Sequence, residues 1–142
     1  MSEVKQVIVF RHDLLKNLRK GKIAAQVAHA SLGALLTMAH REEHTNGFLY
    51  TDKWEKIEFD FQKNSVLDQW LNGIFTKICV YVENEEELLE IYNKAKEANL
   101  PCSLITDAGN TEFHGIKTNT CVGIGPWFSK DIDKITEDLK LF

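Results

Sequence analysis

Lys20-Gly-Lys-Ile-Ala-Ala-Gln-Val-Ala-His29 is the stretch that decides the fold of this chain, because it begins a helix after a strand pattern and a basic connection. On a helix, Lys22, Gln26 and His29 fall at i, i+4 and i+7 and form one polar stripe. The alanines around them are small enough to let the helix approach a sheet closely. We therefore expect a strand at residues 4–10 and a helix over residues 22–40, the first unit of an α/β fold.

The other expected elements follow from hydrophobic periodicity and from turn and capping residues. Further strands are expected at residues 74–82, 101–105 and 118–124, and helices at residues 67–71, at residues 84–95 and after Ser129. Asn84-Glu-Glu-Glu87 is a capping box, and Ser129 is a candidate N-cap for a last helix that carries Ile132, Ile135 and Leu139. The short connection between the last two strands leaves no room for a helical crossover, so we expect them to be antiparallel within a mixed sheet.

Residues 41–65 give no consistent pattern. Asn46-Gly47 marks a turn, whereas Trp54, Ile57 and Phe61 recur at a helical spacing. The sequence leaves the organisation of this segment open.

His40-Arg-Glu-Glu-His44 matches the H-x-x-E-H motif of inverted zinc peptidases, in which two histidines one helical turn apart bind the metal ion and Glu43 lies beside them. No further acidic ligand follows convincingly on a later helix. A solvated helix end with favourable charges explains the same residues. A zinc peptidase acting through His40, Glu43 and His44 is therefore the least favoured hypothesis, and no metal is assigned to the functional site.

The composition is typical of a single soluble domain spanning residues 1–142. The chain is 44% hydrophobic and 27% charged, and no apolar run reaches the roughly 18 residues that span a bilayer. Its 3 cysteines are far apart in the chain, which fits small core residues in a reducing compartment better than a zinc or redox pair. The N-terminus shows no cationic and apolar leader, so we expect the protein in the cytoplasm.

Basic residues are concentrated in one part of an otherwise acidic chain. The formal net charge of -4 argues against a protein that coats nucleic acid over its whole surface. The connection before the helix nevertheless gathers Arg11, His12, Lys16, Arg19, Lys20 and Lys22 around the carboxylate of Asp13. Such a basic rim suits phosphate groups, and the alternative is a solvated loop with ordinary lysines.

Two groups of residues are candidates for a functional site. The polar stripe lies at a helix N-terminus, where free N–H groups and the helix dipole favour anions. Asp107 and Thr111 follow a strand in Asp-Ala-Gly-Asn-Thr, and Thr120 comes after the next loop. A carboxylate can orient water or accept its proton, and hydroxyls can bond to an ester or a ribose. The plainer alternatives are a solvated lysine, a partly buried histidine and an ordinary turn before a strand.

Several motifs run in order from residue 4 to residue 141: Val-Ile-Val-Phe-Arg-His-Asp, Gly-Lys-Ile-Ala-Ala-Gln-Val-Ala-His-Ala, Ser-Leu-Ile-Thr-Asp-Ala-Gly-Asn-Thr, Gly-Ile-Gly-Pro and Asp-Lys-Ile-Thr-Glu-Asp-Leu-Lys-Leu. Together they resemble the peptidyl-tRNA hydrolase 2 family, which is the archaeal and eukaryotic type of this enzyme. The resemblance covers the chain outside about residues 41–65, a segment longer than is usual in the family.

This resemblance implies a three-layer α/β/α domain with a four-stranded mixed sheet and helices on both faces. It also implies hydrolysis of the ester that joins a peptide, or an N-blocked amino acid, to tRNA, without metal or other cofactor, and often as a homodimer. Carried over residue by residue, the catalytic positions are Lys22, Gln26, Asp107, Thr111 and Thr120, with His29 in support. We expect direct attack of water on the ester, and we assign the tRNA contacts to Arg11, Lys16, Arg19, Lys20 and Lys117.

The sequence departs from the family pattern around both groups of site residues. Arg19 stands where the family usually has a glycine, and Asn110 and Glu112 replace the usual basic residue and glutamine beside Thr111. Residues 113–117 replace a loop that normally contains Pro-Gly. These changes leave a second hypothesis open, a catalytically silent RNA-binding or adaptor domain with the same fold.

Overall fold

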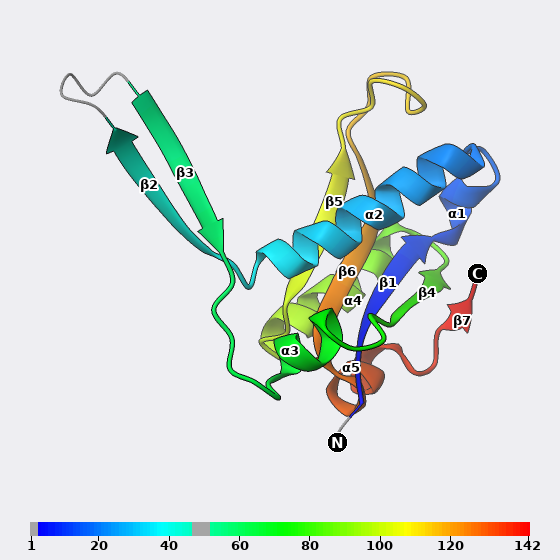
Figure 1. Cartoon of the computed structure of the whole chain (residues 1–142). Coiled ribbons are helices and arrows are strands. Elements are labelled where there is room, and N and C mark those ends of the chain that lie inside the picture. The colour runs from blue at the N-terminus through cyan, green and yellow to red at the C-terminus, as the bar shows by residue number, and fades with distance from the viewer. Residues whose placement is uncertain (1–2, 47–51) are drawn as a thin grey trace.

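A mixed five-stranded sheet, in the order β5-β6-β1-β4-β7, forms the centre of the computed structural model, which describes residues 3–46 and 52–142 (Figure 1). Its strands are β1 (Val4–Arg11), β4 (Lys77–Val82), β5 (Cys102–Asp107), β6 (Thr118–Phe128) and β7 (Lys140–Leu141). β1 runs parallel to β4 and antiparallel to β6, and β5 is antiparallel to β6, as the short connection between them predicts. The expected α/β class and mixed sheet are therefore confirmed.

The expected number of four strands in this sheet is wrong, because β7 adds to it by pairing antiparallel with β4. β7 has 2 residues, too few to show the alternation by which a strand is recognised in a sequence. It follows α5 (Ser129–Thr136), which ends before Leu139 instead of including it. Ser129 is the first residue of α5, and the N-cap position belongs to Phe128, whose side chain makes no capping bond.

Helices cover both faces of the sheet, as expected. α2 (Lys20–Leu36) lies on one face, and α4 (Glu85–Glu97) and α5 lie on the other (Figure 1). The side chains of β1 alternate between the two faces: Ile8 and Phe10 pack against α2, whereas Val7 and Val9 pack with Leu88 of α4. Among the described residues, no helix combines the length and the apolar character that crossing a membrane requires.

The helix boundaries differ in detail from those expected. α2 begins at Lys20, before the expected start at residue 22, and ends at Leu36, before His40. The short helix α1 (His12–Leu15) interrupts the connection that the sequence indicates as a loop. α3 (Val66–Leu71) packs beside β1 and β6 near the expected position.

The predicted N-cap of α4 at Asn84 is confirmed, and the reciprocal bond of the capping box is shifted by one residue. The side-chain oxygen of Asn84 accepts a hydrogen bond from the backbone N–H of Glu87 at 3.0 Å. The carboxylate of Glu87 accepts in turn from the backbone N–H of Glu83 at 2.7 Å, one residue before the position that the motif predicts.

The described part of residues 41–65 contains a β-hairpin and no helix. β2 (His40–Asn46) pairs antiparallel with β3 (Asp52–Glu58), and the two strands project from the rest of the molecule as an arm (Figure 1). The helical spacing of Trp54, Ile57 and Phe61 is therefore misleading, since Trp54 and Ile57 lie on opposite faces of β3. The expected turn begins at Asn46, the last residue of β2, and its second residue, Gly47, lies outside the described residues.

Small residues bring α2 very close to β6. Ala30 and Ala34 of α2 are fully buried, and Gly123 of β6 lies directly beneath them. A Cβ atom added to Gly123 would lie 2.2 Å from the carbonyl oxygen of Ala30. The backbone of α2 is a rigid neighbour, so the expected close approach of this helix to the sheet is confirmed and depends on a glycine at this position.

We expect Gly123→Ala to lower the free energy of unfolding by about 1–3 kcal/mol, because the added methyl group overpacks the contact between α2 and β6. Gly21→Ala is the matched control, since a Cβ at Gly21 meets nothing within 4 Å. In the first turn of α2, alanine should be neutral or stabilising by up to about 1 kcal/mol. Urea unfolding of both variants measures the difference, and equal effects would contradict it.

Candidate active site

The two groups of residues singled out in the sequence meet at one end of the sheet. Lys22 and Gln26 lie on the first turns of α2, Asp107 is the last residue of β5, and Thr120 lies near the start of β6. Because α2 packs across β5 and β6, Lys22 and Gln26 lie at the carboxyl end of β5. The loop that follows β5 adds Thr111 to the same place.

Asp107 is the centre of the hydrogen-bond network at this site. One of its carboxylate oxygens accepts from Lys22 Nζ at 2.7 Å and from Gln26 Nε2 at 3.2 Å. The other oxygen accepts from the backbone N–H of Gly109 at 2.8 Å. The hydrogen bond from Lys22 is the main cause that holds the pKa of Asp107 below its ordinary value, and the Gly109 bond acts in the same direction, against partial burial. The carboxylate is therefore ionised at neutral pH.

Lys22 connects this carboxylate to the loop after β5. Its side chain is only 14% exposed, and its Nζ donates to Thr111 Oγ1 at 3.0 Å as well as to Asp107. The ring of Phe113 lies near the same ammonium group, with its centroid at 5.7 Å. An ammonium group has three N–H donors, so Lys22 can keep both hydrogen bonds and still donate to a ligand.

Gln26 and Thr120 form a buried support behind the carboxylate. They are 2% and 0% exposed, and Thr120 Oγ1 donates to Gln26 Oε1 at 2.6 Å. This bond directs the amide oxygen of Gln26 toward Thr120 and its NH₂ group toward Asp107. Thr120 therefore acts on Asp107 through Gln26 and does not itself reach the surface.

Thr111 and its neighbours close one side of the site. Thr111 is exposed, and Glu112 accepts from the backbone N–H of Arg19 at 3.3 Å, which ties the loop to the start of α2. Gly109 has φ +85, a conformation that glycine adopts readily and that turns its N–H toward Asp107. Sequence reasoning missed the Gly109 N–H and the Phe113 ring, although Asp-Ala-Gly was a recognisable turn signal for the first of them.

The residues expected from the sequence to contact tRNA occupy different environments. Lys16, Lys20 and Lys117 are exposed, and the side chain of Arg19 is 92% exposed. Arg11 differs, because its side chain is only 12% exposed and its charge is already balanced by carboxylates of the protein itself. Its partners are Asp13 at 2.8 Å, Glu85 at 3.2 Å and the backbone carbonyl of Asn119 at 3.0 Å.

His29 lies on the exposed surface of α2, whereas Gln26, one turn earlier, is buried. The two residues therefore do not form the continuous stripe that helical spacing predicts. Lys22 and Gln26 are the members of that stripe that the structure brings to Asp107.

The H-x-x-E-H motif has no helix to support it, because its residues lie in β2. On a strand, His40 and His44 point to one face together with Glu42, and Glu43 points to the other face. The zinc-peptidase arrangement of His40, Glu43 and His44 is therefore wrong.

Comparisons with known proteins agree on one family. The family model of Peptidyl-tRNA hydrolase PTH2 matches residues 4–142. A peptidyl-tRNA hydrolase of Sulfolobus acidocaldarius is 39% identical over 138 residues, which are 97% of this chain and 99% of that protein. The peptidyl-tRNA hydrolase of Methanothermobacter thermautotrophicus is 42% identical over 138 residues, again 97% of this chain and 99% of that protein.

A solved structure resembles the chain at a greater distance. A protein of unknown function from Agrobacterium tumefaciens has a TM-score of 0.51 over 100% of this chain and 99% of its own. The sequence identity is 12%, so this likeness concerns the fold alone.

We expect Lys22→Met to raise the pKa of Asp107 toward its ordinary value, because the methionine cannot donate the hydrogen bond that chiefly lowers it. NMR titration of the Asp107 side-chain carboxyl carbon measures this change. Lys20→Met removes a neighbouring exposed charge and should leave the titration almost unchanged. An unchanged pKa in Lys22→Met would contradict the assignment.

The same shift predicts a pH dependence of stability. Because the pKa of Asp107 is lower in the folded than in the unfolded state, its contribution is complete above the unfolded value of about 3.9 and is lost as the pH falls through the folded value. Acid titration of unfolding should therefore show a smaller loss of stability below about pH 4 in Lys22→Met than in the wild type.

Proposed function

Because the chain belongs to the Peptidyl-tRNA hydrolase PTH2 family, we propose that it hydrolyses the ester bond of peptidyl-tRNA and releases free tRNA and peptide. One contact carries the assignment of the site: the ammonium group of Lys22 lies 2.7 Å from the carboxylate of Asp107. The two groups come from separate motifs and provide the positive charge and the water-binding carboxylate that ester hydrolysis uses.

The reaction that we propose is direct attack of water on the ester carbonyl carbon. As the carbon–oxygen bond to water forms, Asp107 accepts a proton from the water and the carbonyl oxygen gains negative charge. Collapse of this tetrahedral species breaks the ester bond to the ribose oxygen, which takes that proton from Asp107 and leaves as a hydroxyl of tRNA. Lys22 would donate to the developing oxyanion, and Asp107 would orient the water. No covalent bond to the protein is formed in this sequence.

The contact between Lys22 and Asp107 suggests how the carboxylate becomes a base. The hydrogen bond from Lys22 lowers the pKa of Asp107, which weakens this carboxylate as a proton acceptor. When Lys22 also donates to the negative charge that develops on the substrate, its positive charge is shared between two anions, so it stabilises the Asp107 carboxylate less and the pKa of Asp107 rises. Proton acceptance from water is thereby coupled to oxyanion formation.

The remaining site residues divide into two groups in this proposal. Thr111 is exposed and bonded to Lys22, so it can contact the ester or the ribose. Gln26 and Thr120 are positioning residues, because they hold the Asp107 carboxylate from the buried side. His29 lies on the exposed surface of α2, so we assign it only a supporting role.

We propose that the exposed cations around α2 hold tRNA through its phosphates. Lys16, Lys20, Arg19 and Lys117 are exposed and can reach a large polyanion. Arg11, whose charge is balanced by Asp13 and Glu85, is excluded from this group and instead joins the end of β1 to neighbouring segments.

We further propose that residues 1–142 act as one domain in the cytoplasm, where peptidyl-tRNA arises during translation, and that the protein forms a homodimer. The family match over residues 4–142 supports the single domain. The homodimer rests on the expectation for the family, and light scattering of the purified protein measures it.

We expect Asp107→Asn and Lys22→Met each to reduce kcat by about 100- to 1,000-fold, the effect of losing one well-placed group. The assay is release of the N-blocked amino acid from purified N-blocked aminoacyl-tRNA. Lys94→Met, which removes an exposed lysine on α4, is the control and should cleave like the wild type. Full activity of Asp107→Asn would contradict the assignment of Asp107 to the active site. A wild-type protein that does not cleave the substrate would favour the hypothesis of a catalytically silent RNA-binding domain.

We expect KM for the tRNA substrate to rise steeply with salt concentration, because each phosphate contact releases counterions. Lys16→Met and Lys20→Met should each reduce the salt slope by about one and leave kcat nearly unchanged. A KM that stays constant from low to high salt would contradict the phosphate contacts.

A further inference from the structure

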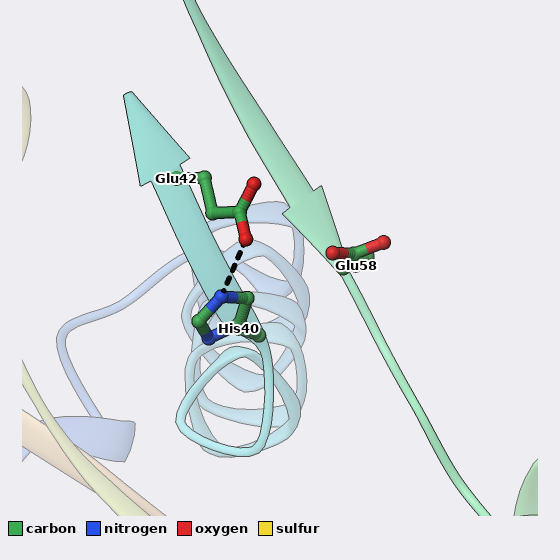
Figure 2. Close-up of side chains that lie close together, drawn as sticks. All are labelled: His40, Glu42 and Glu58. Atoms are coloured by element: carbon green, nitrogen blue, oxygen red, sulfur yellow. Dashed lines mark hydrogen bonds and ion pairs between the residues drawn. The ribbon is translucent and has the colours of Figure 1, made fainter. Parts of the chain in front are cut away.

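The base of the hairpin arm gathers a histidine and two carboxylates on one face. His40, the first residue of β2, lies directly opposite Glu58, the last residue of β3, and Glu42 follows two residues along on the same face (Figure 2). One ligand atom from each of these side chains lies within 4.8 Å of the other two. The three groups thus come from both strands and converge on one small volume.

The carboxylate of Glu42 is held in place by the two histidines of β2. His40 Nε2 lies 3.0 Å from one of its oxygens, and His44 Nε2 lies 3.1 Å from the other. The His44 ring stacks on Trp54 of β3, with the centroids 4.1 Å apart and the planes at 11°. One oxygen of Glu42 is therefore directed at His40, and the other is held by His44, whose ring is fixed by stacking on Trp54. Hydrogen bonds of this kind orient metal-binding carboxylates.

We propose that His40, Glu42 and Glu58 bind one Zn²⁺ ion, with water completing the coordination and His44 orienting Glu42 from behind. Imidazole nitrogen and carboxylate oxygen atoms bind zinc at about 2.0–2.2 Å, which places the ligand atoms of a tetrahedral site about 3.4 Å apart. His40 Nε2 and Glu42 Oε1 lie 3.0 Å apart, and all three ligand atoms lie within 4.8 Å of one another, so rotations of these side chains can bring the atoms to that spacing. The side chains of His40, Glu42 and Glu58 are 59%, 44% and 31% exposed, so an ion can reach them from solvent.

The location indicates that the ion would act as a structural link between strands. A two-stranded hairpin is marginally stable by itself, and this arm leaves the body of the molecule with Trp54 and Ile57 about half exposed. Zinc held by His40 and Glu58 would join β2 to β3 where the arm meets the body. The site is separate from Lys22 and Asp107, and it requires neither peptidase chemistry nor the proposed hydrolase activity.

Lys56 competes with the ion for Glu58. Its Nζ lies 3.1 Å from one carboxylate oxygen of Glu58, so zinc bound to the same carboxylate would be repelled by the Lys56 ammonium group. Lys56→Gln should therefore tighten zinc binding, whereas loss of a ligand should weaken it. If Lys56→Gln tightens zinc binding and Glu58→Gln weakens it, the ion binds at a specific site. General attraction of cations to an acidic protein does not depend on these two positions in this way.

The test is titration of the metal-free protein with Zn²⁺ alone, in competition with a chromogenic chelator. We expect one ion per chain, and we expect His40→Gln and Glu58→Gln each to weaken binding by about ten-fold or more, since even outer partners of a metal site contribute that much. His12→Gln is the matched control, because His12 pairs with Glu83 away from the arm. Absence of saturable binding, or equal affinities in wild type, His40→Gln and Glu58→Gln, would overturn the proposal.

Hydrogen exchange provides a second readout that does not depend on affinity. Zinc should slow amide exchange in residues 40–46 and 52–58 of the wild type and have no such effect in Glu58→Gln. Exchange in the five-stranded sheet should be the same in both proteins, which shows that the variant is folded. Binding without slower exchange in the arm would overturn the role of the ion as a link between strands.

Discussion

The close packing of α2 on β6 is the constraint on which the site depends. Gly123 leaves room for the backbone of Ala30, so the helix lies near enough for Gln26, although buried, to span the distance between Thr120 and Asp107. Lys22, one turn earlier, then reaches the same carboxylate from the helix end. The separation of helix and sheet thus sets the position of charged groups that come from distant parts of the chain.

The hydrogen-bond network around Asp107 contains one positive and one negative charge, which balance each other. The charges belong to one ammonium group and one carboxylate, and behind them the hydroxyl of Thr120 donates to the amide oxygen of Gln26 while the amide NH₂ group donates to the carboxylate. In the described residues no buried side-chain nitrogen or oxygen lacks a partner. A polar cluster of this kind can be kept at the edge of the core because none of its members bears an uncompensated desolvation cost.

Much of the candidate site could be predicted from the sequence, because helix starts and strand ends are local signals. A lysine in the first turn of a helix and an aspartate at the end of a strand are recognisable without knowledge of the fold, and α/β topology brings such ends together. The orientation of Gln26 by Thr120 and the internal pairing of Arg11 with Glu85 could not be predicted, since both depend on tertiary contacts. The hairpin was missed for the same reason: its pairs, such as His44 with Trp54, lie across strands, whereas spacing along the chain suggested a helix.

The arm has a consequence for how this chain can vary in length. His40 and Glu58 pair directly, so the chain leaves the body and returns to it at nearly the same point. For the rest of the protein the arm is then a closed loop, and doubling the length of such a loop costs only about 0.6 kcal/mol in chain entropy. Residues can be added to or removed from its outer part while the register of the five-stranded sheet stays the same. The arm can therefore change in evolution without disturbing Lys22 and Asp107.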